Sequence, residues 1–144
     1  GQIVADFIGW HYADTDDEII HRVGLSVQEI FTKEGEEGFR RYEQIVCQSL
    51  AAKSEQVIST GGGLLMNENN RNLMLKSGMV ICLHASEKVL EARLSDINER
   101  PLVKNWRELL ESRREVYASL PYHIDTSNLS PREVAEKVVA LWRT

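Results

Sequence analysis

The sequence predicts an α/β domain in which a parallel sheet is covered by helices on both faces. Short apolar and β-branched runs alternate with amphipathic stretches along all 144 residues, and this alternation is typical of parallel sheets with helical crossovers. The run MVICLHA at 79–85 has the composition of a strand that is buried on both faces. No internal repeat, low-complexity segment or linker interrupts the pattern, so we expect a single domain over residues 1–144.

The elements can be predicted in order. GQIVADFIG at 1–9 has helical spacing with no capping residue ahead of it, which indicates the interior of a helix. Ser26 with Glu29 forms a capping box, and Ser130 before Pro131 marks another helix start. We expect strands at 10–14, 56–60, 79–85 and 122–127, helices at 17–24, 26–35, 35–53, 67–78, 86–94, 106–120 and 130–142, and a polar loop at 95–105.

Composition excludes several classes of protein. The net charge of −5 argues against a nucleic-acid binder, and no apolar run is long enough for a membrane span. Cys47 and Cys82 lie in apolar stretches without metal-ligand spacing, so we expect two buried thiols and a cytoplasmic protein.

Three consecutive glycines, Gly61, Gly62 and Gly63, follow the strand predicted at 56–60. Glycines at a strand end allow the backbone to approach a ligand closely, and ligands of parallel sheets bind at the carboxyl ends of the strands. A plain turn is the alternative explanation for these glycines.

Two carboxylates, Asp14 and Asp16, end the strand predicted at 10–14. If the extended backbone continues through Thr15, both point to the same side, where they could bind Mg²⁺ and accept a proton from a hydroxyl. The alternative is that Asp16 or Asp17 only caps the next helix.

Arginines occur on two predicted helices and in the polar loop, at Arg40, Arg41, Arg100, Arg113 and Arg114. Helical arginines beside glutamates usually form a solvated, salt-bridged face. However, Arg40 and Glu43 share one helix face, which could instead face a site. Arg100 precedes a proline in the loop, a placement that would suit a lid supplying positive charge.

The order of these motifs resembles shikimate kinase along essentially the whole chain. D-x-D is followed by G-x-x-G-F-R-x-x-E, then by an apolar residue with S/T-x-G-G-G, then by R-P-L, R-x-x-x-Y and D-T-S. The resemblance implies a three-layer P-loop-kinase-like fold and transfer of the ATP γ-phosphoryl group to the 3-hydroxyl of shikimate. That reaction belongs to chorismate and aromatic amino acid biosynthesis. It also implies Mg²⁺ as cofactor and a monomer with no nucleic-acid or membrane partner.

The resemblance also implies roles for individual residues. Asp16 matches the base that binds the shikimate hydroxyls, and Asp14 matches the Mg²⁺ aspartate. Glu43 matches a residue that braces the substrate arginine, and Arg100 matches the lid arginine that reaches the ATP phosphates. The residues that match shikimate-binding positions are Arg40, Arg113 and Gly61–Gly63. The residues that match the region around the adenine are Arg93, Ser127 and Asn128.

Three departures from the family pattern stand out. The G-x-x-x-x-G-K-[ST] loop and its strand, which is central in the family's sheet between the strands at 56–60 and 79–85, do not occur in these 144 residues. We therefore expect this polypeptide alone to be poorly stable and inactive or nearly so. The lid at 95–105 is short, and the missing proline before Tyr117 leaves Arg113 and Arg114 as rival substrate arginines, with Arg113 favoured by its spacing.

Other functions fit parts of this pattern. A related small-molecule kinase such as gluconate kinase shares the fold but does not need this set of motifs. A kinase-like pseudoenzyme or binding domain would not need the phosphate loop. The chain could also be one domain of a larger fused enzyme.

Overall fold

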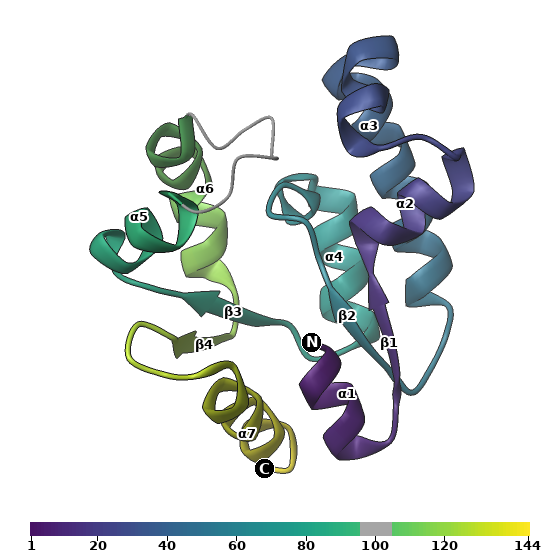
Figure 1. Ribbon diagram of the computed structural model, residues 1–144. Helices are drawn as coiled ribbons and strands as arrows, with labels where there is room; N and C mark the ends of the chain where they lie inside the picture. Colours follow the sequence, from purple (N-terminus) through teal and green to yellow (C-terminus); the bar gives the residue numbers. More distant parts are fainter. Residues whose placement is uncertain (96–104) are drawn as a thin grey trace. The chain divides into compact units, whose positions relative to one another are not determined.

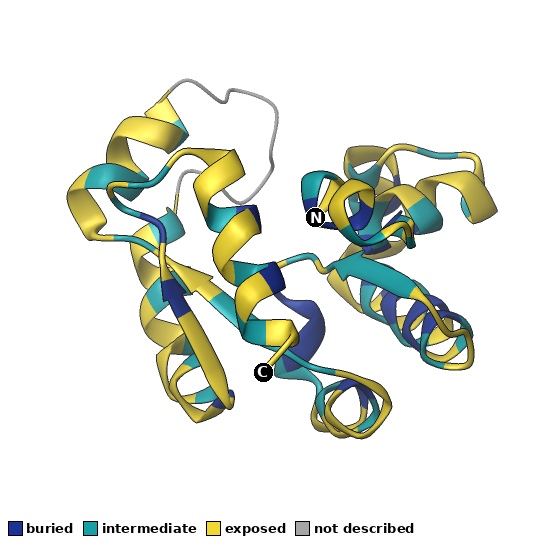
Figure 2. Ribbon diagram, turned by 90° about the horizontal axis from the view of Figure 1, so that it is seen from below, coloured by how far each residue is buried: buried dark blue, intermediate teal, exposed yellow. Residues whose placement is uncertain are grey.

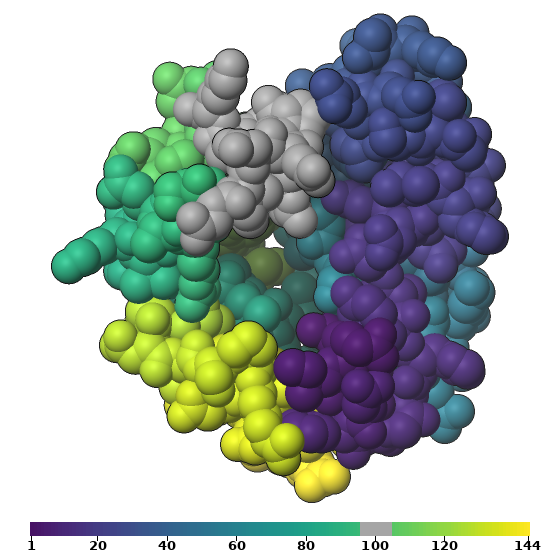
Figure 3. Space-filling view, viewed as in Figure 1, coloured from purple at the N-terminus to yellow at the C-terminus, as the bar shows by residue number. Residues whose placement is uncertain are grey.

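The computed structural model describes residues 1–95 and 105–144. These residues divide into two compact units, Gly1–Met79 and Val80–Thr144. Figure 1 labels the elements of both units, and the space-filling view colours the first unit from purple to teal (Figure 3). In the described residues, no helix is both long and apolar enough to cross a membrane.

The first unit combines two parallel strands with four α-helices. Strands β1 (His11–Asp14) and β2 (Gln56–Ser59) pair in a register that places Ala13 beside Ile58. The helices are α1 (Gln2–Ile8), α2 (Thr15–Val23), α3 (Val27–Ala51) and α4 (Glu68–Ser77), and a 3₁₀ turn, η1 (Leu64–Met66), precedes α4. Apart from η1 and from α3, which was predicted as two helices at 26–35 and 35–53, each of these elements was predicted within a few residues.

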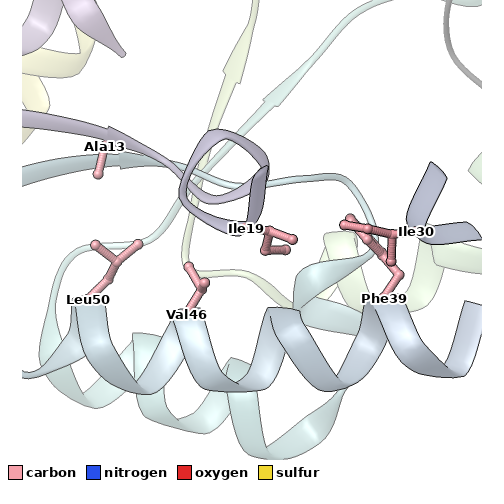
Figure 4. Close-up of a cluster of buried hydrophobic side chains, with 6 residues drawn as sticks. All are labelled: Ala13, Ile19, Ile30, Phe39, Val46 and Leu50. Carbon is pink, nitrogen blue, oxygen red and sulfur yellow. The ribbon is translucent and has the colours of Figure 1, made fainter. Parts of the chain in front are cut away.

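A cluster of buried apolar side chains joins β1, α2 and α3. Its members, labelled in Figure 4, are Ala13, Ile19, Ile30, Phe39, Val46 and Leu50. Ile19 and Ile30 are fully buried, and burying such a side chain stabilises the fold by about 1.5–3 kcal/mol. Figure 2 shows the same helices coloured by burial. This core joins α2 and α3, the two helices that carry Asp16, Arg40 and Glu43.

Helix α3 bends where the sequence predicted a boundary between two helices. Gly35 has φ 68° and ψ −176°, a backbone conformation that is essentially restricted to glycine. The capping box of Ser26 and Glu29 begins the first half, and Glu36, Arg40 and Glu43 all follow the bend. The kink therefore separates the helix start from the segment with the candidate binding residues.

The second unit also has two parallel strands. Strands β3 (Ile81–His84) and β4 (Tyr122–Asp125) pair with Leu83 beside Ile124. Its described helices are α5 (Glu87–Ser95), α6 (Trp106–Ser119) and α7 (Pro131–Trp142), and the last starts after the predicted N-cap Ser130. The strand predicted over 122–127 ends earlier, because Asp125 accepts hydrogen bonds from both the backbone N–H and the hydroxyl of Ser127, which closes a turn.

The α/β class is confirmed, and one sequence prediction about a strand needs correction. The described strands form two separate two-stranded sheets, β1–β2 and β3–β4, as expected for a sheet without the central strand that is absent from these 144 residues. The strand predicted as fully buried at 79–85 is partly open, since Leu83 is 53% exposed. Cys47 is buried as predicted, whereas Cys82 is only half-buried. Most of the predicted lid lies outside the described residues, and a single domain stays a prediction.

Candidate active site

The glycine segment follows β2 directly and turns sharply. The Leu64 N–H donates to the Gly61 carbonyl at 3.2 Å, and the Met66 N–H donates to the Gly63 carbonyl at 3.1 Å. Gly62 is exposed at the tip of this turn, whereas Gly63 is buried. The segment therefore presents backbone to solvent at its centre and packs against the protein at its end.

Two predicted site residues, Asp16 and Arg40, lie against these glycines. A Cβ atom at Gly61 would lie 2.8 Å from Asp16 Oδ1, and a Cβ atom at Gly63 would lie 2.6 Å from Arg40 Nη2. Both distances are shorter than real Cβ contacts. A plain turn does not explain the glycines, because side chains at 61 and 63 would displace a carboxylate and a guanidinium.

The D-x-D motif adopts a different geometry from the one considered for an extended strand. Strand β1 ends at Asp14, and Asp16 lies in the first turn of α2. Asp14 is the N-cap, because its Oδ1 accepts the N–H groups of Asp16 at 2.9 Å and Asp17 at 3.2 Å. The idea that Asp16 or Asp17 caps this helix is also wrong. The helix N-terminus instead favours the negative charge of Asp16.

Arg40 is held between two glutamates of α3. Its Nη1 donates to Glu43 Oε2 at 2.8 Å, and its Nη2 donates to Glu36 Oε1 at 3.1 Å. The Glu43 side chain is 2% exposed and that of Arg40 29%. Burial lowers the pKa of Arg40, but the two carboxylates more than offset this effect, so the pKa is raised overall. This arginine is thus a braced, half-buried cation and not part of a fully solvated face.

An open hollow of about 490 Å³ adjoins Arg40 on α3. It is lined by Glu36, Glu37, Arg40, Arg41 and Gln44. Arg41, by contrast with Arg40, is 63% exposed and lies 4.0 Å from Glu34. The two neighbouring arginines therefore differ in burial, and only Arg40 faces the glycine segment.

In the second unit, the residues predicted near the adenine share one pocket. Its volume is about 720 Å³, and it is lined by Ser86, Lys88, Val89, Ala92, Arg93, Asp125, Ser127 and Asn128. Arg93 donates to Thr126 Oγ1 at 3.1 Å and to the Thr126 carbonyl at 2.9 Å. The Ser86 N–H donates to Ser127 Oγ at 2.9 Å. These bonds tie the start of α5 and the residue Arg93 to the turn after β4.

Asp125 carries a negative charge at the edge of this pocket. The hydroxyl and backbone N–H of Ser127 hold the pKa of Asp125 below its ordinary value, so the carboxylate is ionised at neutral pH. Lys88 contributes a positive charge to the same lining. The pocket can therefore offer both hydrogen-bond acceptors and cations to a polar ligand.

The structure distinguishes between Arg113 and Arg114. Arg113 is half-buried and hydrogen-bonded to Tyr117, whereas Arg114 is exposed and paired with Glu111 at 2.8 Å. Burial raises the pKa of the Tyr117 phenol, and Arg113 partly offsets this rise. Arg113 is therefore the more buried arginine of the two, and its role as the substrate arginine stays a prediction. Arg100, predicted as the lid arginine, lies outside the described residues.

The described residues contain no group of three or more His, Cys, Asp or Glu side chains that could hold a metal ion. Asp14 nevertheless suits Mg²⁺, because this ion prefers oxygen ligands and keeps several waters beside one or two carboxylates and the substrate phosphates. One Asp14 oxygen, Oδ1, is already committed to the helix cap.

Two residues beside this site were missed from the sequence, Thr15 and Asn70. Both are buried polar side chains, at 0% and 4% exposure. Thr15 stands inside D-T-D, where its place between two candidate site residues was the available signal. Asn70 occurs in a polar helix with three other asparagines nearby, so no local pattern distinguished it.

Comparison with known proteins identifies the family of this chain. The family model described as "Shikimate kinase" matches residues 1–143. A shikimate kinase from Thermodesulfovibrio yellowstonii is 37% identical over 145 residues, which cover 96% of this chain and 84% of the relative. One from Thermus thermophilus is 36% identical over 151 residues, covering 99% of this chain and 82% of the relative.

Solved structures give the same result. Shikimate kinase from Acinetobacter baumannii in complex with shikimate has a TM-score of 0.90 at 31% identity, covering 98% of this chain and 83% of that one. The enzyme from Aquifex aeolicus has a TM-score of 0.85 at 33% identity, covering 97% and 85%. Fold and site thus define a protein of the P-loop-kinase-like α/β class. Within that class, the chain belongs to the shikimate kinase family.

Proposed function

We propose that this chain provides the shikimate-binding and catalytic residues of a shikimate kinase, which phosphorylates the 3-hydroxyl of shikimate with ATP. The observation that carries the proposal is the packing of the glycine segment against both Asp16 and Arg40. A carboxylate and a guanidinium held beside exposed backbone suit a small acid with several hydroxyl groups.

Arg40 is the proposed ligand of the substrate carboxylate. A guanidinium binds a carboxylate through charge-assisted, fork-like hydrogen bonds. Glu43 fixes the orientation of Arg40 from the buried side, and Glu36 holds it from the exposed side. An incoming carboxylate would compete with the exposed Glu36 and leave the bond to Glu43 in place. Arg113, beside Tyr117, is the proposed second substrate arginine.

Asp16 is the proposed general base. Its carboxylate lies beside Gly61 at the start of α2, where it can accept a proton from a substrate hydroxyl. Asp14 is the proposed residue for Mg²⁺. When bound, this ion neutralises charge on the ATP phosphates.

The pocket of Arg93, Ser127 and Asn128 is the proposed adenine region, and Arg100 is the proposed lid arginine. Ser127 holds the pocket's turn through Asp125, and Arg93 is fixed through Thr126. A monomer in the cytoplasm, with no nucleic-acid partner, remains part of the proposal. The net charge of −5 and the two free cysteines support it.

The test is an assay of ADP release with shikimate and MgATP. It compares this chain with a form extended upstream by a strand and a G-x-x-x-x-G-K-[ST] loop, since the relatives contain residues beyond the matched part. In an active form, Asp16→Asn should lower kcat by about 10²–10⁴-fold, the usual contribution of a general base. Asp6→Asn is the matched control, because Asp6 is exposed on α1 and bonds only Gln2 among the hydrogen bonds described for it.

Turnover by the extended form, lost in Asp16→Asn and kept in Asp6→Asn, would support the proposal. A folded extended form without turnover would contradict it and favour a binding protein without catalysis. Strong turnover by the 144-residue chain itself would contradict the expectation that the phosphate loop is needed.

A further inference from the structure

We propose that Thr15 and Asn70 are positioning residues that fix the glycine segment at its two ends. This inference rests on the proposed function, because it assigns both residues to the shikimate site. Neither side chain needs to touch the substrate. Their task is to hold Gly61 beside Asp16 and Gly63 beside Arg40.

The first anchor joins the glycine segment to the D-x-D motif. Thr15 is fully buried, and its Oγ1 accepts the Gly61 N–H at 2.9 Å. Thr15 is also the first residue of α2, between the N-cap Asp14 and Asp16. Any movement of Gly61 relative to α2 therefore stretches a partly buried hydrogen bond, and losing this bond removes the protein acceptor of the Gly61 N–H group.

The second anchor holds the exit of the segment. Asn70 Nδ2 donates to the Leu64 carbonyl at 3.2 Å. Asn70 is itself fixed, because its N–H donates to Asn67 Oδ1 at 3.1 Å and its carbonyl accepts from Cys47 Sγ at 3.8 Å. Burial raises the pKa of the Cys47 thiol, so the group stays protonated and able to donate.

Helix α4 reinforces this exit through the residue after Asn70. Arg71 Nη1 donates to the Leu65 carbonyl at 2.9 Å. The 3₁₀ turn that follows the glycines therefore has two of its carbonyls held by side chains of α4. Side chains outside the 3₁₀ turn therefore fix its backbone conformation. Such external support is needed because the preceding glycines have little conformational preference of their own.

The contacts across the segment leave little tolerance for movement. Cβ positions at Gly61 and Gly63 lie within 2.8 Å of the Asp16 carboxylate and the Arg40 guanidinium. The backbone of the glycine segment thus packs directly against the Asp16 carboxylate and the Arg40 guanidinium. A shift of this backbone would change the orientation of both side chains. Misplacing binding groups by about 1 Å can reduce catalysis by roughly 10²-fold, so anchors at both ends have a functional consequence.

The experiment uses four variants of this chain. Thr15→Val keeps the shape and removes the acceptor, whereas Thr15→Ser keeps the oxygen. Asn70→Asp keeps the shape and removes the donor to Leu64. Val46→Ala is the control, since Val46 is 1% exposed in the core cluster and belongs to neither anchor. Thermal unfolding ranks the four variants by stability.

Two readouts separate positioning from general stability. The first is hydrogen exchange of the Gly61 amide by NMR, which needs no substrate. The second is the dissociation constant for shikimate by titration. Thr15→Val should speed Gly61 exchange by about tenfold and weaken shikimate binding by a similar factor, as expected for the loss of one hydrogen bond. Thr15→Ser should restore both values, and Asn70→Asp should weaken binding with a smaller change at Gly61.

The inference is overturned if Thr15→Val leaves Gly61 exchange unchanged. It is also overturned if Val46→Ala, at an equal loss of stability, weakens shikimate binding as much as Thr15→Val does. Absence of shikimate binding in the unmodified chain counts against the proposed function for this chain. Gly61 exchange then still decides whether Thr15 holds the segment.

Discussion

At the scale of single residues, the glycines of this chain meet two different requirements. Gly24 and Gly35 have positive φ values of 74° and 68°, so there the backbone conformation favours glycine. Gly63 has φ −93° and ψ −9°, which any residue adopts. Glycine is needed at 63 because the Arg40 guanidinium fills the place of a side chain.

Gly63→Ala therefore tests whether the space beside Gly63 is needed by Arg40, because alanine adopts this backbone conformation without strain. The added methyl group should push Arg40 away from the glycine segment and weaken shikimate binding by about 10–100-fold, as misplaced binding groups do. The free energy of unfolding should change by less than about 1 kcal/mol, because the guanidinium lies at the end of a flexible chain. Titration with shikimate and thermal unfolding measure the two effects.

Gly78→Ala is the matched control for this variant. Gly78 has an extended backbone, and nothing lies within 4 Å of its Cβ position. Binding should be unchanged in this control. If Gly63→Ala also binds shikimate normally, the contact between Gly63 and Arg40 does not contribute to shikimate binding.

The sequence located some of these residues and not others for a physical reason. Asp16, Arg40 and Gly61–Gly63 belong to motifs whose order along the chain is informative. Thr15 and Asn70 act through contacts that join positions 46 and 6 residues apart. Such a contact depends on packing, which no local pattern encodes.

At the scale of elements, the helix starts were the most predictable features. Ser26 with Glu29 forms the predicted capping box, and the predicted N-cap Ser130 forms a further one with Glu133. These signals are local, because the capping bonds join residues three apart. The N-cap of α2 was predicted wrongly, at Asp16 or Asp17. Asp14, Asp16 and Asp17 can all cap a helix, and Asp14 is the N-cap because β1 ends there.

The capping boxes predict a pH dependence of stability. The backbone and side-chain hydrogen bonds with Ser130 lower the pKa of Glu133 from its ordinary value of 4.5, and Ser26 does the same for Glu29. A carboxylate with a lowered pKa in the folded state stabilises the fold above pH 4.5, and this contribution is lost as the pH falls through the folded pKa.

Glu133→Gln should therefore unfold at a lower temperature than the unmodified chain at pH 7 and at nearly the same temperature near pH 3. Melting curves by circular dichroism across this range provide the measurement. Glu115→Gln is the control, because Glu115 is exposed in the middle of α6. A constant offset between Glu133→Gln and the unmodified chain at every pH would contradict the capping role of the charge.

At the scale of the whole molecule, the sequence predicted the class of fold better than the burial of its strands. Alternating strands and helices were enough for α/β, and parallel pairing is observed in both sheets. The separation into two sheets follows from the absent central strand, which the order of the motifs indicated. The exposure of Leu83 was not predicted, because burial on both faces requires elements that the strand's own sequence does not specify.

The last prediction concerns cooperativity. The two units contain 79 and 65 residues, a size at which a single core is marginal. Among the residues that the structure describes, each has a two-stranded sheet, which is weak without further support. The family match nevertheless runs across both units, over residues 1–143. We therefore expect them to unfold together as one domain, because the core of each unit is marginal by itself.

Tryptophan fluorescence can test this, since Trp10 lies in the first unit and Trp106 and Trp142 lie in the second. Trp10→Phe reports only on residues 80–144, and the double variant Trp106→Phe/Trp142→Phe reports only on residues 1–79. Coincident urea transitions with equal midpoints are expected, as for a two-state domain. Separate midpoints in the two variants, with circular dichroism showing two steps in the unmodified chain, would establish two domains and contradict the single domain that the sequence predicts.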